Sequence, residues 1–309
     1  MTTSIFVLGE ALMDCIAQPD GRLLPLMGGS PFNMARAAAL RGAAVSYLNP
    51  LSADHFGQQL HAQLVANGVQ VLTLASTKPT SLAVVQVTNG QPSYGFYREG
   101  IADRDYSVDG LLAQLKNAPP GILHTGSLAL VPPENEKVLA IVQGVKALGW
   151  TVSVDINLRP KLADDPAAYV AAVRSVMVHA DWLKASDEDL HTLGFENVTR
   201  TQSATVLAAL RSMARPGALS RIALTFGGDG ADLDIDGQHH NLPAHLVKVA
   251  DTVGAGDTFW GNTLADWALQ PADAAGRVDK TLELSMKAAA INCTRQGCQP
   301  PTWAEVLAF

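Results

Sequence analysis

The sequence predicts an α/β fold in which helices cover both faces of a mainly parallel sheet. Apolar, strand-like runs alternate along the chain with segments of helical period, a pattern typical of such sheets. No repeat of about 20–50 residues is visible, and no low-complexity linker divides the chain. We therefore expect a single domain over residues 1–309.

The N-terminal third is expected to open with a buried strand and two helices. The run SIFVLG is the strand. In SPFNMARAAALRG, Ser30 suits the N-cap, Pro31 the first turn and Gly42 the C-terminal stop of a helix. A second helix, ADHFGQQLHAQLVANG, ends near Gly68. The runs VLTL, SLAVVQV and SYGFYR then form strands around a turn at Asn89-Gly90.

The early strands alternate polar and apolar residues, whereas the later strands are continuously apolar. Such alternation indicates that one face of a sheet is in contact with water. Residues about 12–28 and 80–105 are therefore expected to form a small sheet that projects from the main layer.

The later part of the chain contains four strand-plus-loop units, with helices between the first three. They are GILHTGSLAL, TVSVDINLRP, ADWLKASDEDL and RIALTFGGDGADLDI. The clearest helix is ENEKVLAIVQGVKALG, and the final helices are TFWGNTLADWAL and TLELSMKAAAINCTR. His239-His240, beside Gly237, is expected in a solvated turn.

Composition and charge argue against several classes of protein. A net charge of −7 disfavours a general nucleic-acid binder, because phosphate backbones need a basic surface. The longest apolar runs fall far short of the roughly 20 residues of a membrane helix, and no secretory signal is visible. Three cysteines, an odd number, favour a reducing cytoplasm. Cys293 and Cys298 match no common zinc spacing and are expected to be buried.

Five polar clusters follow strands of the predicted sheet. In an open parallel sheet, ligands bind beyond the carboxyl ends of the strands. A glycine-rich turn before a helix is by itself usually only a turn, but five polar loops at one edge favour a ligand site. The clusters are Gly28-Gly29 with Asn33; Asp155, Asn157 and Arg159; 184–189; 225–230; and 251–262.

The stretch DTVGAGDTFWGN places a carboxylate directly behind a glycine-rich turn. Gly254-Ala255-Gly256 would present backbone N–H groups at the positive end of a helix dipole, a site for a phosphate or a developing anion. The helix behind it is expected to be amphipathic, with Trp260 and Leu264 facing a core. One interpretation of Asp257 is a helix N-terminal charge worth roughly a few tenths of a kcal/mol. Beside a phosphate, a carboxylate is better explained as the proton acceptor for an attacking hydroxyl.

Other nucleotide-binding and catalytic motifs are missing or wrongly spaced. GAGDTFWG has four residues, where a dinucleotide-binding fingerprint has two, between its second and third glycines. The chain contains no G-x-x-x-x-G-K-[ST], H-R-D, D-F-G, G-x-S-x-G or H-E-x-x-H motif.

DTVGAGDTFWGN resembles the C-terminal signature of the ribokinase-like, or PfkB, sugar kinases, and GGSPFNMARAAALRG resembles their N-terminal one. GEALMD, LSADHFG, FYREGIAD, DINLRP and CTRQGCQPP stand in the expected order, so the resemblance covers nearly the whole chain. GEALMD and DINLRP resemble fructokinase-type members. The resemblance implies a ribokinase-like three-layer α/β/α fold with the small sheet as a lid. It also implies ATP-dependent phosphorylation of a primary alcohol of a sugar.

The resemblance also implies site residues. Asp257 is the implied general base, with Gly254, Ala255 and Gly256 as the anion hole. Sugar binding is implied for Asp14, Gly28, Gly29, Asn33 and Arg98. The residues expected at ATP are Lys184, Ser186, Thr225, Gly227, Gly230, Gly256 and Asn292, with Arg159 as a candidate phosphate contact.

Two metal sites follow from the same resemblance. A monovalent cation, K⁺, is implied behind the anion hole, with ligands from Asp251, Val253, Asn292, Arg295, Gly297 and Pro301. Many relatives carry Asn-x-x-Glu where Mg²⁺ is ordered, whereas this chain has Ser186 and Asp189 within KASDED. Asp189 is the implied holder of a magnesium-bound water, and Glu188 is the alternative.

The sequence therefore indicates an ATP-dependent sugar kinase that uses Mg²⁺ and K⁺. Fructose is the favoured substrate, with 2-keto-3-deoxygluconate, ribose or a nucleoside as alternatives. Transfer would be in line, and Asp257 would accept the proton late, since an ordinary aspartate has a pKa of about 3.9. A non-catalytic sugar or nucleotide sensor would be expected to lose Asp257 or the glycines before it. A scaffold protein that dimerises through the lid is the third alternative function. Such dimerisation is compatible with an enzyme, and we expect a homodimer through the lid.

Overall fold

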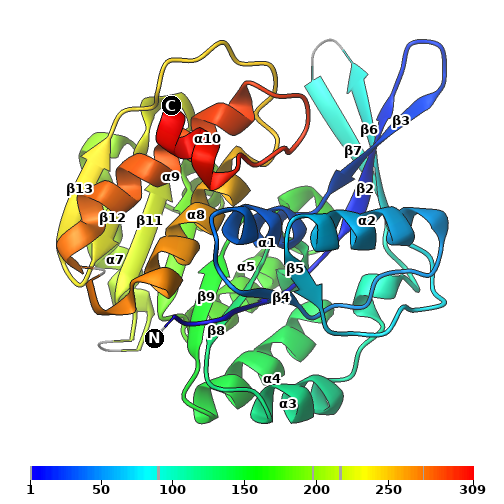
Figure 1. The fold of residues 1–309 in the computed structure, drawn as a ribbon, viewed down its shortest axis with the longest axis horizontal. Coiled ribbons are helices and arrows are strands. Elements are labelled where there is room, and N and C mark those ends of the chain that lie inside the picture. The colour runs from blue at the N-terminus through cyan, green and yellow to red at the C-terminus, as the bar shows by residue number, and fades with distance from the viewer. Residues whose placement is uncertain (1, 89–90, 197, 216–217, 274) are drawn as a thin grey trace.

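The structure, a computed structural model, describes residues 2–88, 91–196, 198–215, 218–273 and 275–309. Figure 1 shows a large sheet with helices on both faces and a small sheet that projects from one corner. The predicted α/β class with a second, smaller sheet is confirmed. The turn predicted at Asn89-Gly90 lies outside the described residues.

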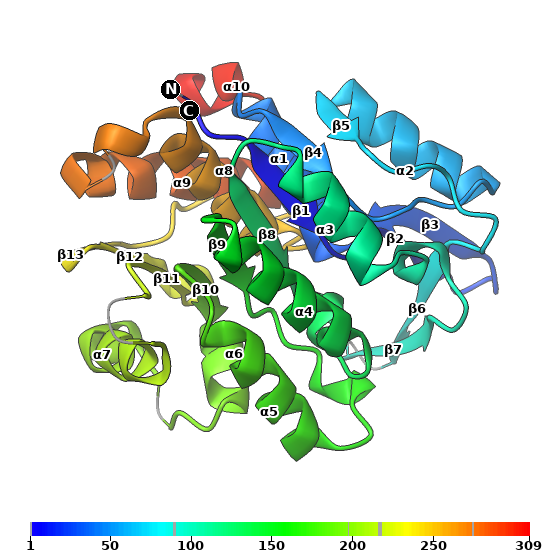
Figure 2. The same cartoon turned by 90° about the horizontal axis from the view of Figure 1, so that it is seen from below.

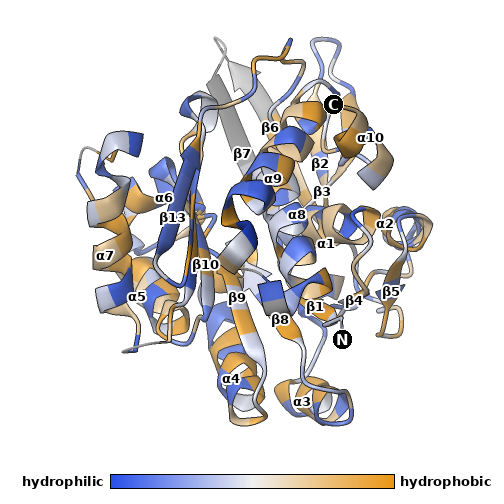
Figure 3. Ribbon diagram, turned by 60° about the vertical axis from the view of Figure 1, so that its left-hand side comes forward, coloured by the Kyte–Doolittle hydropathy of each residue, from blue (hydrophilic) through white to orange (hydrophobic). Residues whose placement is uncertain are grey.

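Parallel strands form most of the large sheet. Across it the order is β13 (Gln238–Leu242), β12 (Ala231–Ile235), β11 (Arg221–Thr225), β10 (Trp182–Ser186), β9 (Thr151–Asp155), β8 (Ile122–Gly126), β1 (Ile5–Leu8), β4 (Val45–Tyr47), β5 (Val69–Val71). Neighbours from β11 to β5 pair in parallel, and β12 and β13 pair antiparallel at one edge. In Figure 3 the edge strand β13 is hydrophilic along its length.

Apolar layers cover both faces of the large sheet. Ile5 and Val7 of β1 point to one face. Phe6 and Leu8 point to the other, as the two-residue period of a strand requires. The first face is covered by α1 (Ser30–Leu40), α2 (His55–Ala66), α8 (Ala255–Leu269) and α9 (Val278–Cys293).

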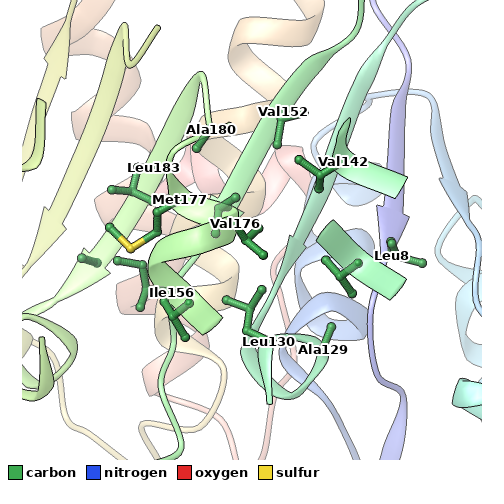
Figure 4. Close-up of a cluster of buried hydrophobic side chains, with 14 of the residues drawn as sticks. Leu8, Ala129, Leu130, Val142, Val152, Ile156, Val176, Met177, Ala180 and Leu183 are labelled. Carbon is green, nitrogen blue, oxygen red and sulfur yellow. The ribbon is translucent and has the colours of Figure 1, made fainter. Parts of the chain in front are cut away.

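The second face carries the remaining long helices. They are α3 (Val108–Lys116), α4 (Glu134–Ala147), α5 (Pro166–Met177) and α7 (Ser203–Met213). Figure 2 shows these helices apart from those of the first face, and Figure 4 shows Leu8 near Val142 of α4 and Leu130 in this layer. The short helix α6 (Asp187–Thr192) follows β10, and α10 (Trp303–Ala308) ends the chain.

The small sheet has the order β3 (Leu23–Gly28), β2 (Leu12–Ala17), β6 (Ser81–Thr88), β7 (Gln91–Tyr97). β2 and β6 pair in parallel, and the outer pairs are antiparallel. The strands lie within the two predicted segments, although β7 ends before residue 98. Leu23 and Leu24 on the outer strand are 50% and 46% exposed.

Several predicted elements differ from the observed ones. Gly29, with φ 106°, is the residue before α1, so Ser30 is the first helical residue and not the cap. β5 begins two residues before the predicted run VLTL. His239 lies in the edge strand β13 beside Asp232, not in a turn, and β4, which has three residues, was not predicted because so short a run has no readable period.

Helix α8 is buried on all sides, so the prediction of an amphipathic helix is wrong. Residues 257–268 are all buried, because α8 lies between the sheet, α1 and α9. At Gly261 a Cβ would lie 2.7 Å from the carbonyl oxygen of Met34, so glycine allows α1 and α8 to touch. The Trp260 indole donates to Ser153 Oγ on β9 at 3.1 Å. Within the described ranges, none of the helices combines the length and apolarity needed to cross a lipid bilayer.

Candidate active site

The carboxylate of Asp257 is held at the N-terminus of α8 by two residues of α1. Ser30 Oγ donates to Asp257 Oδ1 at 2.7 Å, and Asn33 Nδ2 donates to Oδ2 at 3.0 Å. Asp257 is 7% exposed. Burial raises its pKa, and the hydrogen bonds from Asn33 and Ser30 oppose that shift. The result is an oriented carboxylate that is more basic than a free aspartate.

The backbone around Asp257 can bind an anion, but the Ala255 N–H is not one of the free donors as predicted. Gly254 has φ 73°, and a Cβ there would lie 2.1 Å from Cys298 Sγ, so the position requires glycine. The Ala255 N–H already donates to the Thr252 carbonyl at 3.2 Å. Gly256 and Asp257 belong to the first turn, whose N–H groups have no intrahelical acceptor and lie at the positive end of the helix dipole.

Lys184 adds a positive charge at the same point. Its Nζ lies 2.9 and 3.0 Å from the two carboxylate oxygens of Asp155, and both residues are buried. A Cβ on Gly256 would lie 3.3 Å from Lys184 Nζ, which places the ammonium against the start of α8. Burial alone would lower the pKa of Lys184, but Asp155 and Asp189 outweigh it, so the pKa is raised and the ammonium stays charged.

The residues predicted to bind sugar lie beside this anion site. The Asp14 carboxylate lies against Gly28, where a Cβ would be 2.2 Å from Asp14 Oδ2. A Cβ on Gly29 would lie 2.6 Å from the carbonyl of Glu10. Burial raises the pKa of Asp14 to about 6, while Arg159 opposes and Asp257 adds to that shift. Asp14, Arg159 and Asp257 therefore share one electrostatic environment.

Arg159 is the exposed residue of this environment. Its Nη1 lies 2.6 Å from Asn157 Oδ1 and 2.9 Å from the Leu158 carbonyl. Asn157 adopts φ 38°, which turns the chain sharply after β9. The positive charge of Arg159 opposes the rise in the pKa of both Asp14 and Asp257.

Arg98, predicted to bind sugar, lies in a buried cluster of charges. Its Nη2 is 3.3 Å from Asp103 Oδ2, and its Nη1 donates to the Leu128 carbonyl at 3.4 Å. Glu10 lies in the same cluster and accepts the Ser30 N–H at 3.2 Å. Burial raises the pKa of Glu10 to about 7, with Arg98 opposing the shift. Arg98 therefore bonds to Asp103 and Leu128, and its charge acts on Glu10, which holds the first N–H of α1.

In the acidic loop after β10, Asp189, one of the two candidates for the magnesium-bound water, has a structural role. Ser186 and Asp189 form a capping box at the start of α6. Asp189 Oδ1 also accepts the Leu158 N–H at 2.6 Å, and Oδ2 accepts the Ser186 N–H at 2.8 Å. Both carboxylate oxygens of Asp189 are thus used to join two loops, and Glu188 is the exposed acid.

The predicted ATP loop is a tight turn between β11 and β12. Thr225 ends β11, and the Phe226 N–H donates to the Gly230 carbonyl at 2.9 Å. Gly227 has φ 51° and is exposed. Gly230 has φ 115°, and a Cβ there would lie 2.1 Å from the Leu242 carbonyl. The turn therefore exposes its backbone at the edge of the sheet that also carries Lys184 and α8.

Three of the six predicted potassium ligands, Asp251, Val253 and Asn292, have oxygens that are engaged with N–H donors. Asp251 accepts from the backbone of Val253 and Gly297, and the Val253 carbonyl accepts from the Asn292 side chain. The main-chain carbonyl of Asn292 accepts the Arg295 N–H at 3.0 Å. A cation shell needs oxygens whose lone pairs converge on the ion. The oxygens of Asp251, Val253 and Asn292, each held by an N–H donor, do not fit such a preformed shell.

Comparison with known proteins agrees with the family resemblance of the sequence. The sequence matches the family described as "pfkB family carbohydrate kinase" over residues 2–305. The chain belongs to this family. The fructokinases of Rhizobium leguminosarum bv. trifolii and Klebsiella pneumoniae are each 30% identical to this kinase, over 266 and 277 residues. The alignments cover 84% and 87% of this kinase, and 78% and 85% of the two relatives.

The solved structures confirm the ribokinase-like fold predicted for this kinase. The crystal structure of fructokinase with bound ATP from Xylella fastidiosa has a TM-score of 0.82 at 28% identity. The match covers 100% of this kinase and 98% of that chain.

Ser30 is a site residue that the sequence analysis missed. Its position before a helical run predicted a cap, yet its hydroxyl faces a carboxylate 227 residues later in the chain. A serine directly after two glycines in the N-terminal signature is the only sequence signal that points toward the site.

Proposed function

We propose that this carbohydrate kinase transfers the γ-phosphoryl group of ATP to the 6-hydroxyl of fructose, with Asp257 as the general base. The observation that carries the proposal is the convergence of a buried, oriented carboxylate with a charged lysine and a helix N-terminus. The fructokinase relatives at 30% identity support fructose over other sugars.

Asp257 would accept the proton of the attacking hydroxyl as the new O–P bond forms. Ser30 and Asn33 hold both carboxylate oxygens, so the carboxylate loses little freedom when it binds the hydroxyl. The raised pKa of Asp257 makes it a better base than an exposed aspartate. Asp14, beside Gly28, would accept hydrogen bonds from other sugar hydroxyls.

Positive groups would stabilise the charge that is transferred. The Lys184 ammonium lies beside Gly256, and the first-turn N–H groups of α8 point toward the same space. Arg159, exposed and near Asp257, would contact the phosphates of ATP. Mg²⁺ bound with ATP would neutralise phosphate charge, and Glu188 is the acid placed to hold a water of that ion.

The test is ADP release by the purified protein with ATP, Mg²⁺ and a panel of sugars, beside Asp257→Asn. Turnover with fructose that the variant loses would support both the reaction and the base. Turnover only with 2-keto-3-deoxygluconate, ribose or a nucleoside would replace the substrate. ATP binding without turnover of any sugar would favour a sensor.

We also propose a homodimer formed through the small sheet. Leu23 and Leu24 are half exposed on its outer strand, and burying such apolar area favours association. Light scattering of the purified protein would give the mass, and a monomer at all concentrations would refute the dimer.

A further inference from the structure

The loop that forms the anion site is held from behind by a second loop. The anion-hole loop is residues 251–256, and the C-terminal loop, residues 294–302, lies against it. Cys298 Sγ occupies the space beside Gly254, and the Cys298 carbonyl accepts from the buried guanidinium of Arg36 at 3.2 Å. A displacement of Cys298 would therefore act directly on Gly254, which precedes Asp257.

The Asp251 carboxylate makes the first set of bonds between the two loops. Its Oδ1 accepts the Val253 N–H at 3.0 Å within the anion-hole loop. Its Oδ2 accepts the Gly297 N–H at 2.9 Å and the Gln296 side-chain amide at 3.2 Å. Both oxygens are satisfied by donors of the chain.

The side-chain amide of Asn292 makes the second set of hydrogen bonds between the two loops. Asn292 is in the last turn of α9 and is 0% exposed. Its Nδ2 donates to the Val253 carbonyl at 2.8 Å, and its Oδ1 accepts the Gln299 N–H at 2.8 Å. One planar group thus joins the anion-hole loop to the C-terminal loop. Because the amide nitrogen is a donor, it presents the partial positive charge of an N–H group to the Val253 carbonyl.

A monovalent cation bound at this place would hold the two loops together in the same way. It would attract the Val253 carbonyl and the Asp251 carboxylate and so tie the two loops together. Here N–H groups of Asn292, Gln296 and Gly297 already face these oxygens. The main-chain carbonyl of Asn292 is also engaged, by the Arg295 N–H at 3.0 Å.

We propose that Asn292 is a positioning residue that holds the anion-hole loop in place of a monovalent cation, so that this kinase works without potassium. The rate measurements below rest on the proposed kinase function, with whichever sugar the panel identifies. The melting measurements do not depend on that function.

The experiment compares potassium chloride with choline chloride at a matched ionic strength of about 0.1 M, because choline is too large for a site between the loops. The wild-type kcat is expected to differ by less than about twofold between the salts, and its melting temperature is expected to be the same in both. Potassium-specific activation of roughly tenfold or more, or a potassium-specific rise in melting temperature, would overturn the proposal.

Two variants test the amide itself. Asn292→Asp removes the donor and sets a second carboxylate beside Asp251, so kcat in choline is expected to fall roughly tenfold and to recover in potassium. Asn292→Ala frees the Val253 carbonyl and should show a smaller fall with the same recovery. If both variants keep the wild-type rate in choline, the positioning role is refuted.

Asn135→Ala is the matched control, since Asn135 is buried in α4, far from both loops. It is expected to keep the wild-type ratio of rates in the two salts. A potassium response in this variant as well would mean that the response reports general loss of stability, and would overturn the assignment to Asn292. The wild-type measurements stand alone where a variant fails to fold.

Discussion

The substitution Asp257→Asn removes the proposed proton acceptor and keeps the shape and hydrogen bonds of the site. The Ser30 hydroxyl, 2.7 Å from Oδ1, can donate to an asparagine oxygen as it does to the carboxylate. At Oδ2 the new NH₂ group would face the Asn33 Nδ2 donor. Among the described residues Asn33 Oδ1 has no partner, so the Asn33 amide can rotate and accept from the new NH₂ group.

The expected loss is therefore one of rate, with little effect on folding. A positioned general base contributes roughly 10²–10⁴-fold, which corresponds to about 3–5 kcal/mol in the activation free energy. Burial raises the pKa of Asp257, so the charged form is disfavoured in the folded state, and its replacement by a neutral amide should not lower the melting temperature.

The assay is ADP release under saturating ATP, Mg²⁺ and sugar, with the melting temperature of each protein measured in parallel. Ser30→Ala is the matched variant, since it keeps the carboxylate and removes one of its hydrogen bonds. We expect its kcat to fall by roughly 10- to 150-fold, in line with about 1.5–3 kcal/mol for a hydrogen bond to a charged group. A kcat of Asp257→Asn within about threefold of wild type would refute the role of base.

Three further predictions concern the surroundings of the site. Gly261→Ala would place a Cβ 2.7 Å from the Met34 carbonyl; we expect urea denaturation to show a loss of about 1–3 kcal/mol, and an unchanged midpoint would mean that α1 and α8 separate easily. Lys184→Met leaves the buried Asp155 carboxylate unpaired. We expect this variant to lose about 3–5 kcal/mol in the free energy of unfolding. The double variant, Lys184→Met with Asp155→Asn, should recover stability but not the affinity for ATP measured by calorimetry. Burial raises the pKa of Glu10 from 4.5 to about 7, so the folded chain binds this proton more tightly and stability falls as pH rises through that window. Glu10→Gln should remove a fall of about 3 kcal/mol between pH values below and above the window, and parallel pH profiles of the two proteins would contradict this.

The sequence predicted the class of fold and the chemistry because both depend on local patterns. Continuous apolar runs such as IFVL in β1 indicate strands buried on both faces, and their alternation with helices indicates a parallel sheet. Gly254 and Gly256 before a helix predict an anion site, since only glycine adopts φ 73° at this place and leaves the backbone open. These features need no knowledge of distant contacts.

The tertiary structure decided which groups meet. Ser30 reads as a helix cap, but Gly29 takes that place and the hydroxyl is turned to Asp257 on another helix. Asp189 stands in an acidic run, and two N–H groups from separate loops converge on it. Nothing in either local sequence distinguishes these outcomes, because the partners lie up to 227 residues apart.

The same division explains the site as a whole. By itself, the sequence determined that a carboxylate follows a glycine turn, that a lysine ends one strand and that an asparagine follows two glycines. Only the packing of α8 against α1 and the sheet decided that Asp257, Lys184 and Asn33 lie together, and that Asn292 reaches the Val253 carbonyl. The physical reason is that hydrogen bonds and ion pairs act over a few ångströms in space, whatever the separation along the chain.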